Sequence, residues 1–169
     1  MRVLGIDPGS LATGYGLVTV HGSTLRRVAG GTIRARGDTL ADRLAHLQRE
    51  LARAIEELAP EVAALEAVFS AKNARSALVL GHARGVALAA CGCAGLTPAE
   101  YTPQQVKAAV TGYGRAEKPQ VMKMVQRLLG LAELPPNDEA DALAIAICHG
   151  MGLRMGAAVR AAQLAERAP

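Results

Sequence analysis

Four acidic residues stand where their carboxylates could act together on a metal ion. Asp7 follows the first apolar run of the chain, and Glu66 interrupts a later one. Asp138 and Asp141 are three residues apart, a spacing that puts both side chains on one face of a helix. Converging carboxylates repel one another unless a cation offsets their charge, and hard oxygen ligands suit Mg²⁺ or Mn²⁺. Two such ions about 4 Å apart can hold a phosphodiester, activate a water molecule and stabilise the leaving oxygen.

Each acid also has an ordinary structural explanation. Asp7 begins an Asp-Pro-Gly sequence, which is common in turns. Asp138, Glu139 and Asp141 would be favoured near a helix N-terminus by the helix dipole. Glu66 is harder to explain in this way, because a carboxylate inside an apolar strand is costly unless it is paired or coordinated. The combination of acids, rather than any one of them, favours a metal site.

The elements that would position these acids are predicted from apolar spacing and from turn residues. Strands are expected at residues 2–6, 13–20, 24–33, 62–68 and 97–101, and helices at residues 40–58, 73–94, 103–110, 119–129 and 138–151. Three strands followed by strand–helix alternation predict an α/β domain with a five-stranded mixed sheet flanked by helices. If the first and fourth strands are parallel neighbours, Asp7 and Glu66 emerge at the same sheet edge, where ligands of open α/β sheets bind.

The composition fits a single globular domain with a mild preference for anionic partners. The chain has 169 residues, of which 50% are hydrophobic, and a formal net charge of +4. Aromatic residues make up 2%, which excludes a broad stacking platform for nucleic acid. The odd number of cysteines, three, does not suggest a disulfide framework.

The same sequence predicts a cytoplasmic protein with one domain and a tail. No uninterrupted apolar stretch approaches the roughly 20 residues that span a bilayer, so we expect no membrane partner. Asp7 comes too early for the apolar part of a signal peptide. The domain is expected over residues 1–153, and the Ala- and Arg-rich residues 154–169 are expected to form a flexible tail.

A set of short motifs, in order along almost the whole chain, resembles the RuvC family of Holliday-junction resolvases. The motifs are Gly5-Ile6-Asp7-Pro8-Gly9-Ser10, Thr13-Gly14-Tyr15-Gly16, Glu66, Val68-Phe69, Ala71-Lys72-Asn73, Ser76-Ala77-Leu78, Ala83-Arg84-Gly85-Val86, Gln105-Val106-Lys107, Ala116-Glu117-Lys118 and Asp138 followed by Ala140–Ala146. The opening motif also occurs in other ribonuclease-H-like and actin-like proteins, whereas the full ordered set is specific.

The resemblance implies a ribonuclease-H-like fold and an endonuclease that cuts four-way DNA junctions symmetrically. It implies that Asp7, Glu66, Asp138 and Asp141 are the catalytic, metal-binding acids; some members carry His at the third position, where this chain has Asp138. It also implies that Lys107 and Lys118 lie near the active site. The partners it implies are a second copy of the chain, junction DNA and the RuvA–RuvB branch-migration machinery.

Residues that would hold DNA are expected around the strand that ends near Glu66. Lys72, Asn73 and Arg75 precede or begin a helix, and helix N-termini bind phosphate well. Arg115 and Lys118 add positive charge farther along the chain. Phe69, the only Phe, is either a core residue or, as the resemblance favours, a wedge that stacks on a base at the junction.

Two glycines four residues apart, Gly81 and Gly85, indicate the close approach of another backbone to their helix. That backbone belongs either to a partner subunit or to the same domain.

Two other functions compete with the nuclease. An actin-like nucleotide-binding domain would place Asp7-Pro8-Gly9 near ATP phosphates, but such proteins need a second domain and a second glycine-rich loop. A non-catalytic junction-binding protein would have no use for four acids, all of which are present.

Overall fold

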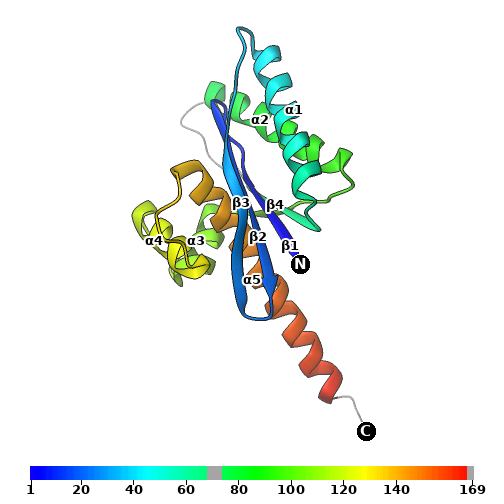
Figure 1. Ribbon diagram of the computed structural model, residues 1–169, viewed down its shortest axis with the longest axis vertical. Helices are drawn as coiled ribbons and strands as arrows, with labels where there is room; N and C mark the ends of the chain where they lie inside the picture. The colour runs from blue at the N-terminus through cyan, green and yellow to red at the C-terminus, as the bar shows by residue number, and fades with distance from the viewer. Residues whose placement is uncertain (68–73, 167–169) are drawn as a thin grey trace.

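The computed structural model describes residues 1–67 and 74–166, which form a five-stranded sheet and five helices (Figure 1). The strands are β1 (Arg2–Asp7), β2 (Ala12–His21), β3 (Thr24–Arg34), β4 (Val62–Glu66) and β5 (Ala99–Tyr101). The helices are α1 (Leu40–Leu58), α2 (Ala74–Cys93), α3 (Pro103–Thr111), α4 (Lys118–Leu129) and α5 (Asn137–Glu166). Along the sheet the strand order is β3-β2-β1-β4-β5. The first three strands are antiparallel, whereas β1–β4 and β4–β5 are parallel, so the predicted mixed sheet is confirmed.

Helices cover both faces of this sheet, as predicted (Figure 1). On one face, α1 and α2 pack through residues such as Leu47 and Leu51 against Leu4 and Ile6. On the other face, α5 lies against β1 and β2, and α3 and α4 pack around it. The apolar residues whose spacing predicted α1 form its buried face, since Leu47, Leu51 and Ile55 are all in the core.

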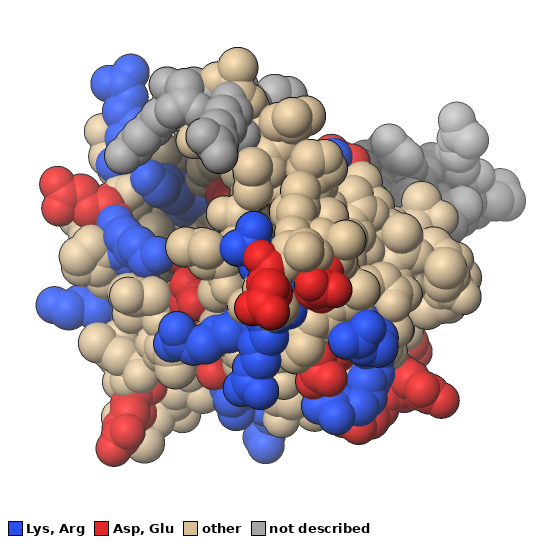
Figure 2. Space-filling view, turned by 90° about the horizontal axis from the view of Figure 1, so that it is seen from above, with Lys and Arg blue, Asp and Glu red and all other residues tan. Residues whose placement is uncertain are grey.

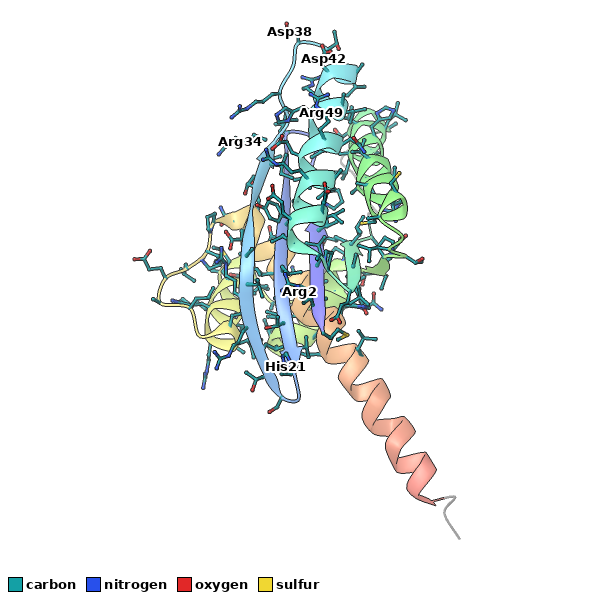
Figure 3. The ribbon with its side chains drawn as sticks, turned by 45° about the vertical axis from the view of Figure 1, so that its right-hand side comes forward. Arg2, His21, Arg34, Asp38, Asp42 and Arg49 are labelled. Atoms are coloured by element: carbon teal, nitrogen blue, oxygen red, sulfur yellow. The ribbon has the colours of Figure 1, made fainter. Side chains whose placement is uncertain are left out.

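The two ends of α1 follow from local chemistry. Thr39 caps the N-terminus: its side chain accepts a hydrogen bond from the Asp42 amide, and the Asp42 carboxylate accepts one from the Thr39 amide. Ala59 ends the helix with φ 40°, directly before Pro60. The connection from β3, with Asp38 at its tip, rises above the sheet to the first turn of α1, where Asp42 lies (Figure 3).

Glycines in the sheet make the groove in which α5 lies. A Cβ atom at Gly5 would be less than 3.0 Å from the backbone oxygen of Ala142, and one at Gly14 would be equally close to that of Asp138. Gly16 and Gly30 are similarly covered by α5 side chains. The helix therefore approaches the sheet more closely than any strand residue with a side chain would allow. This close approach places the first turn of α5 beside the end of β1.

Helix α5 is longer than predicted. Its expected end near Met151 is wrong, because the helix continues to Glu166 through the segment that we expected to be a flexible tail. Ala, Leu, Gln and Arg dominate this segment, and these are strong helix formers with no proline among them. Its last turns project away from the sheet (Figure 1).

Helix α2 corrects the expectation that no segment of the chain is long and apolar enough to span a bilayer. Residues Ser76–Cys93 of α2 are long and apolar enough, by length and composition alone, to cross a membrane. The same segment contains Arg84, whose guanidinium forms an ion pair with Glu100 at 2.5 Å. One face of α2 is buried in the core beside α1 through Ala83, Ala87, Ala90 and Cys91. These contacts make α2 an integral helix of the domain.

Candidate active site

Asp7 and Glu66 lie side by side at one edge of the sheet, as the sequence predicted. β1 and β4 are parallel neighbours whose last paired residues are Ile6 and Leu65, so the next residue of each strand is an acid at the same edge. Both acids line a pocket of about 210 Å³. Asp141 of α5 lines the same pocket, which therefore collects three of the four predicted acids.

Two lysines and an apolar wall complete the pocket. Lys107 of α3 and Lys118 of α4 line it together with the acids, so both lysines lie near the acids, as the resemblance implied. The remaining lining residues are Pro103, Val106, Val121, Ala144 and Ile145. This apolar wall was not anticipated, because its members come from three helices whose packing is not visible in the sequence. It limits the water around the acids and so strengthens their mutual repulsion.

Burial and mutual repulsion make the acids difficult to ionise together. Burial raises the pKa of Asp7 to about 7, with further increases from Glu66, Asp141 and Asp138 that Lys118 partly offsets. Burial and the charge of Asp141 raise the pKa of Glu66 as well, against a hydrogen bond with Asp7 and the charges of Lys107 and Lys118. A cation placed among these groups would lower both pKa values.

Lys118 supplies one positive charge to this cluster. Its Nζ lies 2.5 Å from Oδ2 of Asp141. Burial would lower the pKa of Lys118, but the hydrogen bond and charge of Asp141, helped by Asp7 and Asp138, raise it instead. The lysine is therefore a fixed positive charge at the mouth of the pocket, and about half of its side chain is exposed.

Asp138 departs from the predicted arrangement. It lies in the first turn of α5, three residues before Asp141, and its charge raises the pKa of Asp7, but it does not line the pocket. Among residues 1–67 and 74–166, no three acidic, His or Cys side chains already form a ready-made set of metal ligands. The chemistry of the donors nevertheless fits a hard divalent cation, since carboxylate oxygens with raised pKa values surround one small pocket.

The predicted DNA contacts are only partly within the described chain. Phe69, Lys72 and Asn73 lie outside the described residues, as does the side chain of Arg75. Arg115 is exposed in the connection between α3 and α4. Figure 2, which views the molecule from the end where β1 and β4 end, shows Lys and Arg side chains spread over this face with acidic groups among them.

Gly81 and Gly85 lie on the outward face of α2. Both are exposed, and a Cβ atom at either would meet nothing within 4 Å in the described part of the chain. The alternative that these glycines serve close packing within the domain is therefore wrong. The glycines that do serve such packing are those under α5, which the sequence did not single out.

One buried ion pair was also missed. Glu139, expected to be an ordinary acid of the first helical turn, is buried and paired with Arg27 of β3. Its neighbours in sequence resemble those of any helix start, so no local signal distinguishes it. A long-range partner 112 residues away decides its environment.

Known proteins similar to this chain identify its family. The family described as "Crossover junction endodeoxyribonuclease RuvC" matches residues 3–149. The protein of that name from Syntrophotalea carbinolica is 55% identical over 150 residues, which are 88% of this chain and 93% of the relative. The one from Trichlorobacter lovleyi is 53% identical over 150 residues, covering 88% of this chain and 84% of the relative.

Solved structures extend this agreement to three dimensions. The structure of Thermus thermophilus RuvC superimposes with a TM-score of 0.84 at 36% identity, covering 92% of this chain and 97% of the other. The same protein in complex with Holliday junction substrate gives a TM-score of 0.87, also at 36% identity, covering 92% and 96%. The expected ribonuclease-H-like fold is confirmed. The chain belongs to the RuvC family of crossover junction endodeoxyribonucleases.

Proposed function

We propose that this chain is a structure-selective endonuclease that resolves four-way DNA junctions by paired symmetric nicks in homologous recombination and repair. The observation that carries the proposal is the pocket at the ends of β1 and β4, where three acids and two lysines meet. The T. thermophilus relative was solved with a Holliday junction substrate, which supports the same substrate for this chain.

The reaction would be metal-dependent hydrolysis of a phosphodiester bond. Asp7, Glu66, Asp138 and Asp141 would hold Mg²⁺ or Mn²⁺, as two ions in each active site. When bound, the ions supply an activated water and stabilise charge on the leaving oxygen. Lys107 and Lys118 line the same pocket and would offset the negative charge that builds up on the phosphate oxygens.

Residues outside the pocket would hold the junction arms. We assign phosphate contacts to Lys72, Asn73 and Arg75 near the start of α2 and to Arg115, which is exposed. Phe69 would stack on an unpaired base beside the exchange point. We further expect the protein to act in the cytoplasm beside the RuvA–RuvB branch-migration complex.

The function is tested with a synthetic four-way junction and a linear duplex of the same sequence, each incubated with Mg²⁺, Mn²⁺ or EDTA. We expect paired nicks in the junction, an intact duplex and no nicks in EDTA. Junction binding without nicks under any ion would favour the non-catalytic alternative. ATP binding without junction binding would favour the actin-like alternative. Either result would refute the proposal.

The proposed enzyme is a homodimer, because a four-way junction presents two equivalent strands for cutting. The outward face of α2 supports this assembly. Leu78 on this helix is 65% exposed, and Gly81 and Gly85 beside it leave room for another backbone. A C₂ interface uses the same patch on both subunits, so the outward face of α2 can supply both halves of the dimer interface.

Replacing Gly81 with Leu is expected to weaken the dimer. Overpacking at a close helix contact costs about 1–3 kcal/mol, and the symmetric interface would contain the new side chain twice. Sedimentation at micromolar concentration should then show monomer, and nicks in the two strands should become uncoupled. Ala108→Leu, at an exposed position of α3 on the other side of the sheet, is the matched control. An unchanged dimer in Gly81→Leu would rule out this face.

A further inference from the structure

An ion pair between a buried carboxylate and a partly exposed arginine joins the start of α5 to the edge strand β3. Nε of Arg27, in β3, donates a hydrogen bond to Oε1 of Glu139 at 2.6 Å. The Glu139 side chain is only 6% exposed, whereas that of Arg27 is 33% exposed. A carboxylate this deeply buried depends on its partner, because removing the partner leaves an uncompensated charge in the interior. The pair therefore constrains where the first turn of α5 can lie.

An irregularity in β3 brings Arg27 to the correct face of the sheet. Ile33 packs in the core layer under α1, and Leu25 packs in the layer under α5. Residues eight apart would share a face in a regular strand, because side chains alternate with a period of two. The pairing with β2 shifts at this point and leaves Val28 without a partner in the ladder. This bulge turns Leu25 and Arg27 toward α5.

The glycine opposite the pair completes the contact. A Cβ atom at Gly30 would lie 2.6 Å from Oε1 of Glu139 and 2.8 Å from its Cγ and Cδ atoms. The Glu139 side chain thus lies flat on the backbone of β3, held below by Gly30 and at its end by Arg27. These contacts hold Glu139 on the side of α5 that faces β3.

The anchored residue lies between two of the proposed metal ligands. Asp138 precedes Glu139 directly, and Asp141 follows two residues later on the same turn. The backbone oxygen of Asp138 rests against Gly14 of β2, which pairs with Asp7. Two contacts therefore fix this turn: Gly14 sets its height above the sheet, and Glu139 with Arg27 sets its rotation about the helix axis.

We propose that Arg27 and Glu139 are positioning residues that hold the carboxylates of Asp138 and Asp141 toward Asp7. The inference rests on the proposed function of the pocket, and it adds two residues that do not themselves line that pocket. If Arg27 and Glu139 position the metal ligands, their loss should weaken the binding of the metal ion and leave the binding of junction DNA unchanged.

The test measures Mn²⁺ binding to the DNA-free protein by titration calorimetry, at a temperature where circular dichroism shows every variant folded. Arg27→Met is expected to weaken Mn²⁺ binding by about tenfold to a hundredfold, the usual effect of losing a residue that orients a metal ligand. Junction affinity in EDTA should stay within about twofold, because it depends on phosphate contacts elsewhere. Arg27→Lys, which keeps the charge, should recover part of the lost affinity.

Two further variants keep the test decisive. Glu139→Gln preserves the shape of the side chain and leaves no unpaired buried charge, so it should fold even if Arg27→Met does not; it should weaken Mn²⁺ binding in the same direction, but less. Arg26→Met changes the exposed neighbour of Arg27 and should bind Mn²⁺ like the unmodified protein.

The outcomes separate this inference from the proposed function. If Arg27→Met or Glu139→Gln melts at a lower temperature but binds Mn²⁺ normally, the pair only stabilises the fold and the inference is overturned. If the unmodified protein binds Mn²⁺ and cuts junctions while all variants match it, the inference alone fails. If the unmodified protein binds no Mn²⁺ and cuts nothing, the proposed function fails first, and the inference falls with it.

Discussion

Asp7→Asn is expected to abolish junction cleavage while junction binding stays intact. The substitution keeps the size of the side chain and removes its charge, so the pocket loses an anionic ligand at the end of β1. Metal ions contribute several kcal/mol to transition-state stabilisation in such reactions, which corresponds to roughly a thousandfold loss of rate. Binding depends on basic groups and on shape, which the substitution does not change. Single-turnover cleavage and a gel-shift titration in EDTA measure the two quantities separately.

The same substitution should stabilise the protein when no divalent ion is present. Asp7 has a pKa of about 7 in the folded chain and an ordinary value of 3.8, because burial and neighbouring acids disfavour its ionised form. An acid with a raised folded pKa destabilises the fold as pH rises from its unfolded pKa, and the loss is complete above its folded pKa. In EDTA the melting temperature of the unmodified protein should therefore fall between about pH 4 and pH 7, and Asp7→Asn should melt higher above this range.

An acid outside the pocket provides the matched control. Asp38 is exposed at the tip of the connection between β3 and α1, on the same end of the molecule (Figure 3). Asp38→Asn should cut junctions at the normal rate and melt normally. Cleavage by Asp7→Asn at a rate near that of the unmodified protein would remove Asp7 from the mechanism.

The part of the site that follows from strand order was predictable from the sequence. Asp7 and Glu66 each end an apolar run, and parallel neighbouring strands must bring such residues to one edge. The apolar spacing of α1 was equally informative, because one face of that helix is buried and the others are not. The apolar runs and the helix spacing depend on neighbouring residues in the chain, which a single sequence displays directly, whereas the pairing of β1 with β4 could be stated only as a condition.

The part that depends on distant contacts was not predictable. Asp138 and Asp141 were expected to act alike, yet only Asp141 lines the pocket, and Asp138 acts on Asp7 through its charge from the same turn of α5. The position of α5 over the sheet is set by Gly5 and Gly14, which stood out in the sequence only as parts of family motifs and not as helix contacts. Glu139 needed both the bulge in β3 and Arg27 before its burial could be understood.

Gly14→Ala is therefore expected to lower stability and cleavage together. Its Cβ atom would lie less than 3.0 Å from the backbone oxygen and carbon of Asp138. Both sides of this contact are backbone, so no change of rotamer can relieve it, and the first turn of α5 must move. Overpacking of this kind costs about 1–3 kcal/mol, or several degrees of melting temperature in a chain of this size. Asp138 and Asp141 move with the turn, so the cleavage rate should fall although every acid is still present.

Gly152→Ala is the control for this substitution. Gly152 also lies on α5, but the nearest atom to its Cβ position is Oη of Tyr101 at 3.8 Å, an ordinary contact. Alanine is favoured over glycine within a helix by about 1 kcal/mol, so this variant should melt at the same temperature or higher and cut normally. Thermal melting in EDTA together with single-turnover cleavage then distinguishes the two ways of disabling the site. Asp7→Asn removes a charge and should raise the melting temperature, whereas Gly14→Ala displaces a helix and should lower it. If Gly14→Ala melted and cut like the unmodified protein, the close contact between β2 and α5 would not be what positions the acids.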